Sequence, residues 1–399
     1  MSSTAAFQIE LAGNLTGVAN KRSLLLRLIR AAQPITRTEI AGRLEIDKST
    51  VTENVKPLMD AGILREDTLE VSGQGRKPRV LSFAREQDYF IGVNLGVRRS
   101  QVGITTLKGD IIEDEFDFET PTDVKAALRM VRSQIDEIVK ANKERELKMI
   151  GVSVPGMTDT NRSSLVFAPN LDWRNINVAE ALNIDGVGVV VENDSTAAAM
   201  YEARMKIRSS NEGLMTNFIL VRSGTGIGVG LVIGSEVYRG SGLTRGIAGE
   251  FGHMTIVAGG KQCVCGNRGC WEKYASAAAA ASLFLGDRPL RRGETLPRFV
   301  EIVAKAENGD NRSRRTLEMI GDYLGIGIAN VIMGIGIPRV IISGRLVYGW
   351  QFIEKPLRDA IDRSIVGKTK GWSVEAGSPA GAAIGGALEV AVESYLATV

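Results

Sequence analysis

Two short runs decide the fold: GEFGH at residues 249–253 and CVCGNRGCWE at residues 263–272. The second run contains all three cysteines of the 399-residue chain, and the first ends at its only histidine. Three thiolates and one imidazole complete the tetrahedral shell of a structural zinc ion, whereas a catalytic zinc keeps one position open. The pattern therefore predicts a closed, structural zinc site; the alternative is free cysteines near a surface histidine. The candidate ligands are His253, Cys263, Cys265 and Cys270.

Composition limits the class of protein. An odd number of cysteines, with an N-terminal run that lacks the basic and apolar regions of a signal peptide, predicts a reducing, cytoplasmic location. No apolar run reaches the ~18 residues that a membrane span needs. The longest, at residues 324–337, is interrupted by Asn330 and stopped by Pro338, which favours a buried helix or strand pair and no membrane contact.

The excess positive charge lies in the first fifth of the chain. Residues 1–85 contain 13 Lys and Arg against 9 Asp and Glu, whereas the remaining residues contain 36 against 37. A basic small domain attached to a nearly neutral body suggests a polyanionic partner.

The apolar pattern of this basic region predicts a winged helix-turn-helix domain over residues 1–83. Apolar residues recur at helical spacing in three segments. These are residues 21–32, a second helix that begins after a cap at Thr36 or Thr38, and residues 48–61. Two strand-like runs around a basic, glycine-containing tip then form the wing. This layout places the second helix of the motif in the major groove of double-stranded DNA. The alternative is a small helical protein-protein module.

The predicted DNA contacts fall on that helix and on the wing. Asn54 and Ser49 are the best candidates for base edges, and the basic wing would contact phosphates or the minor groove. The predicted DNA-binding residues are Lys48, Ser49, Thr50, Asn54, Arg76, Lys77 and Arg79.

The rest of the chain predicts an α/β body of two lobes. A β-β-β-α-β pattern begins near residue 90, and a second set of strands begins at residue 218. Two such halves fit the actin-like (ribonuclease H-like) sugar-kinase architecture, with a ligand cleft between the lobes. The predicted lobes are residues 84–200 and residues 201–377, the second with the zinc loop. Residues 378–399 are expected to form a helix, capped by Ser378, that packs back on the body.

The two opening runs resemble a family signature. GEFGH followed by C-x-C-G-x-x-G-C-x-E strongly resembles the signature of the ROK family (repressors, open reading frames and sugar kinases), and so does VEND at residues 191–194. A winged helix-turn-helix before such a body resembles the repressor branch of this family. The resemblance covers essentially the whole chain.

The resemblance implies a sugar site. In this family the two glutamates, the histidine and the asparagine-aspartate pair of these motifs bind sugar hydroxyls, and carboxylates suit that role as acceptors. Two further positions resemble sugar-side loops of the family. Without the signature, the alternative for the asparagine, the aspartate and the first glutamate is ordinary caps and turns. The implied ligand-binding residues are Gly156, Asn170, Asn193, Asp194, Glu250, His253 and Glu272.

One loop departs from the kinases of the family. Asp194 matches the catalytic base of those kinases, and residues 223–228 resemble their second phosphate loop. The first phosphate loop, D-x-G-G-T in family kinases, is NLGVR at residues 94–98. Asn94 lacks the carboxylate, Val97 adds a branched Cβ, and Arg98 replaces the hydroxyl. We therefore expect no catalysis, although Arg98 leaves a sugar phosphate open as the ligand.

The predicted function is a sugar-responsive transcriptional regulator, most simply a repressor, of carbohydrate metabolism genes. Sugar binding is expected to close the lobes and to shift two DNA-binding domains in a homodimer or higher homo-oligomer, which changes the affinity for the operator. The zinc would hold the loop that carries His253 and Glu272. The alternatives are an active ATP-dependent sugar kinase with a DNA-binding domain and, more remotely, a structural adaptor.

Overall fold

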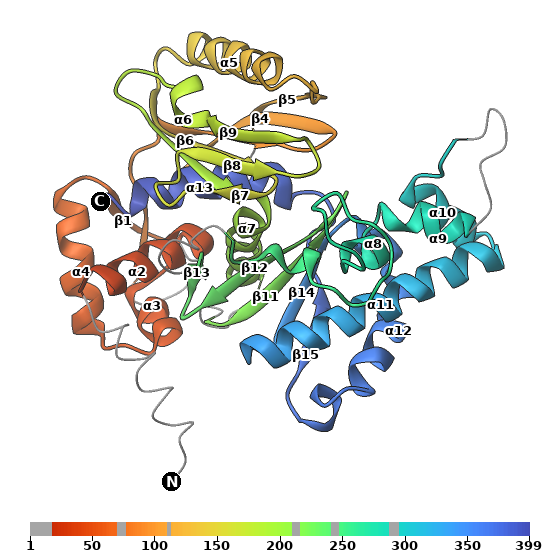
Figure 1. Cartoon of the computed structure of the whole chain (residues 1–399). Coiled ribbons are helices and arrows are strands. Elements are labelled where there is room, and N and C mark those ends of the chain that lie inside the picture. Colours follow the sequence, from red (N-terminus) through yellow and green to blue (C-terminus); the bar gives the residue numbers. More distant parts are fainter. Residues whose placement is uncertain (1–17, 70–76, 110–112, 210–215, 241–246, 287–294) are drawn as a thin grey trace.

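The N-terminal part of the chain is a winged helix-turn-helix domain (Figure 1). The structure, a computed structural model, describes residues 18–69, 77–109, 113–209, 216–240, 247–286 and 295–399. The second helix begins with a capping box, in which the Thr36 hydroxyl accepts from the Glu39 amide and the Glu39 carboxylate accepts from the Thr36 amide. The elements are α2 (Val18–Ala32), α3 (Arg37–Leu44), α4 (Lys48–Asp60), β1 (Leu64–Thr68) and β2 (Arg79–Phe83).

The first lobe is built on a five-stranded sheet of order β10-β6-β3-β4-β5. The β3 strand pairs parallel with β6 and antiparallel with β4, and β10 continues the parallel side. One face packs on α5 (Val124–Ala141), whose buried residues lie on one side of the helix. The strands are β3 (Asp88–Leu95), β4 (Arg99–Thr106), β5 (Glu113–Glu119), β6 (Glu146–Val154) and β10 (Gly188–Asn193). A small sheet and one short helix complete the lobe: β7 (Met157–Thr158), β8 (Ser164–Ala168), β9 (Trp173–Asn177) and α6 (Val178–Ala181).

The second lobe repeats the same strand order as β15-β14-β11-β12-β13, again with two parallel and two antiparallel pairings. This internal repeat confirms the two-lobed α/β fold. The strands are β11 (Phe218–Ser223), β12 (Ile227–Ile233), β13 (Glu236–Tyr238), β14 (Arg339–Gly344) and β15 (Ser373–Ala376). Its helices are α8 (Glu272–Ala275), α9 (Ala279–Leu285), α10 (Phe299–Glu307), α11 (Asn311–Ile335) and α12 (Trp350–Asp362), with short 3-10 turns η3 (Glu250–His253), η4 (Arg345–Gly349) and η5 (Val366–Lys368).

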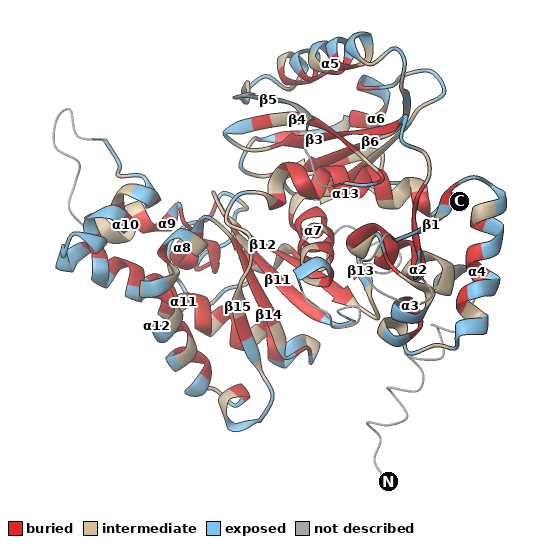
Figure 2. Ribbon diagram, turned by 180° about the vertical axis from the view of Figure 1, so that it is seen from behind, coloured by how far each residue is buried: buried red, intermediate tan, exposed pale blue. Residues whose placement is uncertain are grey.

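Two helices join the lobes to each other and to the DNA-binding domain: α7 (Asp194–Ser209) and α13 (Ala382–Leu396). The α13 helix packs on the first-lobe strands β3 and β6 and on α7, while α7 also packs on β11 and β12 of the second lobe. Figure 2 shows α13 buried along most of its length. The core of the winged helix domain is continuous with the last turns of α13, where Ala391, Val392 and Leu396 join it.

Some sequence predictions need correction at this level. Ser378 does not cap the last helix, because α13 begins only at Ala382. The Ser378 amide instead donates to the Glu202 carboxylate (2.6 Å), and its carbonyl accepts from the Ser343 hydroxyl (2.8 Å), so Ser378 anchors the loop between β15 and α13. The expected boundary at residue 200 falls inside α7.

The apolar run at residues 324–337 lies in α11, a single helix. By length and composition α11 is the one helix in the described part of the chain that could cross a membrane. Half of that apolar window is buried in this fold, where α11 packs on α12, α8 and α10.

Candidate functional site

The exposed face of α4 carries only part of the predicted DNA-binding set. Lys48 and Ser49 are exposed in its first turn and Thr50 is half-buried there. Asn54 differs from the prediction, because its side chain is only 8% exposed and its amide donates to the Thr50 carbonyl (2.8 Å). The reason is helical periodicity: residue 54 lies beside Val55 on the stripe that packs into the domain. Asn54 is therefore not available to a base edge in this structure.

The described wing residues lie at the start of β2, with Lys77 just before the strand and Arg79 as its first residue. Lys77 and Arg79 are exposed, and the Arg79 guanidinium pairs with Glu66 on the neighbouring strand (3.3 Å). Arg76 lies outside the described residues. The wing contacts thus remain predictions, and Arg79 would have to exchange its carboxylate partner for a phosphate.

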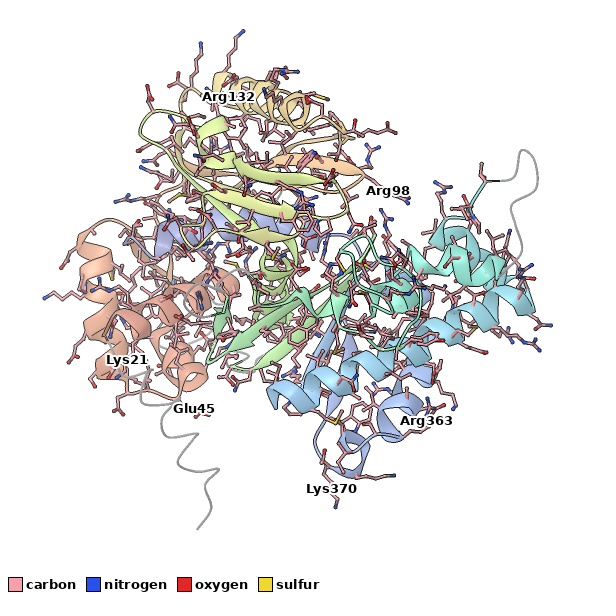
Figure 3. All side chains as sticks on the ribbon, in the orientation of Figure 1. Lys21, Glu45, Arg98, Arg132, Arg363 and Lys370 are labelled. Carbon is pink, nitrogen blue, oxygen red and sulfur yellow. The ribbon has the colours of Figure 1, made fainter. Side chains whose placement is uncertain are left out.

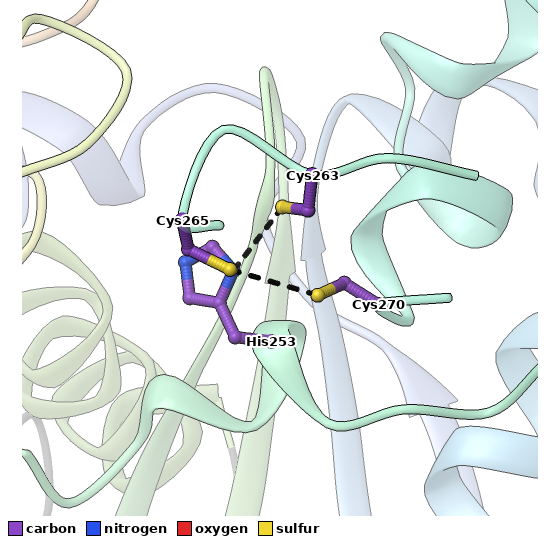
Figure 4. A group of neighbouring side chains, drawn as sticks. All are labelled: His253, Cys263, Cys265 and Cys270. Atoms are coloured by element: carbon purple, nitrogen blue, oxygen red, sulfur yellow. Dashed lines mark hydrogen bonds between the residues drawn. The ribbon is translucent and has the colours of Figure 1, made fainter. Parts of the chain in front are cut away.

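The four predicted metal ligands point toward one another (Figure 4). Their ligand atoms all lie within 4.8 Å of one another, with the Cys265 and Cys270 sulfurs 3.7 Å apart and the Cys263 sulfur 3.6 Å from His253 Nδ1. A tetrahedron with Zn–S bonds of about 2.3 Å has edges of about 3.8 Å, so the donor set and its spacing fit a tetrahedral ion. Burial raises the pKa of the Cys263 thiol, and the adjacent Glu272 carboxylate also raises it. A bound cation would offset both effects, because metal binding displaces the thiol proton.

The cluster is anchored to the second lobe by the residue that follows its last cysteine. Trp271 is fully buried, and its indole nitrogen donates to the Tyr323 carbonyl of α11 (2.9 Å). Gly327 lies so close that a Cβ there would come within 2.0 Å of the indole ring. One continuous segment therefore lies between α11 and the cleft. It consists of Cys270, Trp271 and Glu272, the first residue of α8.

A cleft of about 350 Å³ lies between the lobes, and all seven predicted sugar-binding residues line it. At one end it is rich in carboxylates. Glu250 and His253 lie on η3, where Glu250 Oε2 is 3.8 Å from His253 Nε2, and Glu272 follows the cysteine loop. Burial, then the charges of Asp194 and Glu272, raise the pKa of Glu250 to about 7. His253 thus turns Nδ1 toward the cysteine cluster and Nε2 toward Glu250. Its imidazole ring also lines the cleft.

Asn193 and Asp194, at the junction of β10 with α7, also line the cleft. The Asn193 amide oxygen accepts from the backbone of Ser195 and Thr196 (2.8 and 3.1 Å), and its nitrogen donates to the Gly156 carbonyl (2.9 Å). Asn193 is therefore a helix cap as well as a cleft residue. The Asp194 carboxylate pairs with Arg222 Nη1 at 2.5 Å.

Two equivalent hairpins also line the cleft, and the part that they line is here called its hairpin end. One joins β3 to β4 through the NLGVR loop, and the other joins β11 to β12 through Gly224, Thr225 and Gly226. Asn94 and Arg222 occupy matching positions, since each lies opposite a serine of the adjacent parallel strand. The Asn94 side chain is buried and bonded to Ser153 (3.1 Å) and Gln101 (3.4 Å). A Cβ at Gly226 would lie 2.3 Å from Glu272 Oε2, so this glycine permits close approach of the loop to the carboxylate end.

Similarity to known proteins agrees with this geometry. Residues 90–393 match the ROK family, and residues 20–65 match a winged helix-turn-helix DNA-binding family. The chain belongs to the ROK family. This ROK chain is 29% identical over 347 residues to the xylose repressor of Bacillus subtilis, covering 86% of this chain and 87% of the repressor. It is 28% identical over 351 residues to the DNA-binding transcriptional dual regulator NagC of Escherichia coli, covering 85% and 82%.

Enzymes of the ROK family are similar to the body of the chain. The glucokinase of Streptomyces coelicolor is 30% identical over 290 residues, which cover 69% of this chain and 88% of that enzyme. Among solved structures, a ROK family transcriptional regulator described as a homolog of the Escherichia coli MLC protein superposes with a TM-score of 0.74 at 22% identity, covering 95% of this chain and 96% of that one. A ROK glucokinase from Streptomyces griseus superposes with a TM-score of 0.64 at 26% identity, covering 76% and 99%.

Sequence reasoning missed other residues that line the cleft of this ROK chain, among them two arginines. Arg222 and Arg345 line the hairpin end of the cleft together with Arg98. Arg222 is the penultimate residue of β11, and Arg345 directly follows β14. Their position could have been predicted from the sequence, because both lie at the carboxyl ends of adjacent parallel strands, and such side chains meet at one edge of a sheet.

Proposed function

We propose that this ROK family member is a sugar-responsive, DNA-binding repressor of carbohydrate metabolism genes in the cytoplasm. The observation that carries the proposal is the continuity of the two functional regions. The α7 helix begins at Asp194 in the cleft, α13 contributes Ala382 and Ala383 to the cleft wall, and both helices end against the winged helix domain. Similarity over most of the chain to regulators of sugar genes supports the same function.

A buried charge network joins these helices to the DNA-binding domain. Glu389 on α13 lies between Arg30 on α2, which it contacts closely, and Arg204 on α7, whose Nη1 is 2.9 Å from Glu389 Oε1. All three side chains are buried. Because an unpaired buried charge costs about 3–5 kcal/mol, the three helices are expected to move together. We propose that closure of the lobes around a sugar is transmitted along this network and repositions α4 in a homodimer.

The zinc ion has a structural role in this proposal. His253, Cys263, Cys265 and Cys270 would hold it, and it would supply a cross-link between η3 and the cysteine loop. Glu250 and Glu272, which flank the cluster, would then be fixed in position to accept hydrogen bonds from sugar hydroxyls.

Two features favour a sensor over a kinase. The carboxylate in the base position, Asp194, is held by the Arg222 guanidinium, which competes with a substrate hydroxyl for it. The Asn94 amide stands where family kinases have a carboxylate. Sugar-dependent formation of ADP by the purified chain, with any of D-glucose, D-xylose or N-acetylglucosamine, would favour the kinase alternative.

The central test is a measurement of DNA binding with and without sugar. Operator sequences can be selected from a random duplex library by the full chain, and their affinity measured by fluorescence anisotropy in the presence of D-xylose, D-glucose or N-acetylglucosamine. We expect selective binding that at least one of these sugars, or its phosphate monoester, weakens by about tenfold or more, within the usual range of allosteric coupling. Selection of no preferred sequence, or affinity that none of these compounds alters, would refute the proposal.

The transmission step has its own test. Arg27 on α2 pairs with Glu393 on α13 at 3.1 Å, and both are partly exposed, so the Glu393→Gln chain should fold. We expect it to bind sugar and DNA but to show a smaller change in DNA affinity on sugar addition. Glu354→Gln is the matched control, because it removes an exposed ion pair within α12, remote from the DNA-binding domain. An undiminished sugar effect in Glu393→Gln would exclude this contact from the transmission.

A further inference from the structure

A small cavity lies where the winged helix domain meets the two helices that join the lobes. Its volume is about 40 Å³, and its walls come from α2, α7, α13 and the hairpin of β12 and β13. A water molecule needs about 10–15 Å³ of such space, so the cavity has room for more than one water molecule or for a monatomic ion. It is distinct from the interlobe cleft, because no described residue lines both.

The wall of this cavity carries more positive than negative charge. Arg27 Nη2 pairs with Glu393 at 3.1 Å, whereas Glu389 pairs with both Arg30 and Arg204. With both carboxylates ionised, three positive and two negative charges leave one positive charge in excess. Burial raises the pKa of Glu393, and protonation of that carboxyl group would increase the excess. The five charged residues in the wall are Arg27 and Arg30 on α2, Arg204 on α7, and Glu389 and Glu393 on α13.

Arg30 is only partly satisfied by its neighbours. Its side chain is 3% exposed, and its Nη1 donates to Glu389. Its Nε and Nη2 are also buried, and neither has a hydrogen-bond partner in the described part of the chain. Burial lowers the pKa of Arg30, while Glu389 opposes this effect and Arg204 adds to it. The guanidinium group therefore needs an acceptor for two nitrogens as well as a compensating charge.

A monatomic anion would supply both. A halide ion accepts several N–H groups at once and is only slightly larger than a water molecule. Water would accept hydrogen bonds from Arg30 but would leave the excess charge uncompensated, which is costly for a buried cation. Phosphate esters and organic acids have several heavy atoms and exceed a space of about 40 Å³.

We propose that this cavity is a binding site for a small monovalent anion such as chloride, held by the Arg30 guanidinium at the junction of α2, α7 and α13. The bound anion stabilises the docked position of the winged helix domain on the body. The site is independent of the sugar-sensing function proposed above, because it requires only that this domain is docked.

Bromide locates the ion directly. Crystals of the full chain are soaked in sodium bromide, and anomalous scattering is measured at the bromine absorption edge. We expect a peak in the cavity within hydrogen-bonding distance of Arg30 Nε or Nη2. A cavity that holds only water or nothing in these crystals would overturn the proposal.

Thermal unfolding in solution measures the stabilisation. The Tm of the full chain is compared in sodium chloride and in sodium gluconate at the same ionic strength of about 0.15 M. Gluconate has the same charge as chloride but is too large for the cavity. Because a ligand that binds only the folded chain raises its stability, we expect the chloride-minus-gluconate difference in Tm to be about 2 °C or more larger in the natural chain than in Arg30→Met. An equal difference in both chains would mean a general salt effect and would overturn the proposal.

Two further variants keep the test independent of the fate of Arg30→Met, which leaves a buried carboxylate with one partner fewer. Ala203→Val places two methyl groups at the cavity wall and leaves all five charged residues intact, so it should also lose the chloride effect. Arg363→Ala removes an exposed arginine that pairs with Asp322 and lies far from the winged helix domain in Figure 3, so it should keep that effect. A full chloride effect in Ala203→Val would place the anion elsewhere and refute the site.

The possible outcomes separate this inference from the proposed function. If a sugar weakens DNA binding while no bromide enters the cavity, the anion site is wrong and the repressor stands. If bromide occupies the cavity while no sugar alters DNA affinity, the anion site stands and the proposed function fails.

Discussion

The two ends of the interlobe cleft differ in chemistry although equivalent strands build them. The carboxylate end holds Glu250, Glu272 and His253 on the segment that the cysteine cluster organises, and the hairpin end holds Arg98, Arg222 and Arg345 at strand termini. Both lobes have the same strand order, and matching positions hold the neutral Asn94 in one lobe and the charged Arg222 in the other. The two lobes thus share one strand order, whereas the cleft between them has carboxylates in one part and arginines in the other.

This difference predicts which features of the cleft would depend on the proposed zinc ion and which depend on strand geometry alone. The carboxylate end consists of η3, the cysteine loop and the first residue of α8, which a bound ion would cross-link. The hairpin end is fixed by the backbone pairing of two sheets. Loss of metal should therefore damage one end far more than the other.

The largest expected effect follows from breaking the cluster. Cys265→Ser should lose the metal and reduce affinity for neutral sugars by about 100-fold, the upper end of the range for loss of metal-site geometry. Zinc content is measured by atomic emission and sugar binding by calorimetry. Val264→Ser, an exposed neighbour that is no ligand, is the control. Full affinity for a neutral sugar in zinc-free Cys265→Ser would contradict the dependence.

A smaller effect is expected where the two ends touch. Gly226→Ala would place a methyl group 2.3 Å from Glu272 Oε2, so the hairpin or the carboxylate must shift. Affinity for neutral sugars and for sugar phosphates should fall together by about tenfold or more, as for a lost hydrogen bond to a charged group. Gly224→Ala, where the added Cβ meets no atom within 4 Å, should have much the smaller effect in the same calorimetric assay. Equal affinities for both variants would show that the contact is unimportant.

Glu250→Gln tests the carboxylate end alone. Removal of one acceptor charge should weaken neutral sugars and sugar phosphates by a similar factor of about ten, because the hydroxyls are common to both. Glu236→Gln on the exposed edge of β13 is the control. A loss confined to sugar phosphates would mean that Glu250 lies near the phosphate group and not near the sugar hydroxyls.

The smallest expected effect is that of salt. Raising ionic strength from about 0.05 to 0.5 M should weaken sugar phosphate binding by a factor of about three to ten, since the exposed arginines at the hairpin end are screened. Affinity for neutral sugars should hardly change. Equal salt dependence of the two ligand classes, measured by titration, would remove the distinction between the ends.

Much of the fold and of the candidate cleft could be predicted from the sequence, because local signals carry them. The winged helix elements, the strand ends and the cysteine cluster each lie within a short stretch, and the cleft brings together the residues that the family signature implied. Asn54 was misplaced because it lies at the border of the apolar stripe, where a shift of one position turns an outer residue inward. Ser378 was misplaced because its polar groups bind the neighbouring strand and helix instead of a new helix.

The remaining features depend on contacts between distant parts of the chain. Arg30 and Glu389 are separated by 359 positions, and neither has a local partner that would mark it as buried. The convergence of Arg98 with Arg345 likewise requires the two lobes to face each other. Such pairings follow from the tertiary arrangement and leave no periodic pattern in the sequence.

Trp271 gives the cysteine segment an optical property. The indole is sealed from solvent, bonded to Tyr323 and adjacent in sequence to Cys270, whereas the other three tryptophans lie in other segments, at Trp173, Trp350 and Trp372. Removal of metal with a chelator would loosen this segment and expose the ring, which shifts its fluorescence emission to longer wavelength. On the proposal that the cluster holds zinc, the emission of Trp271 would report metal occupancy without any label.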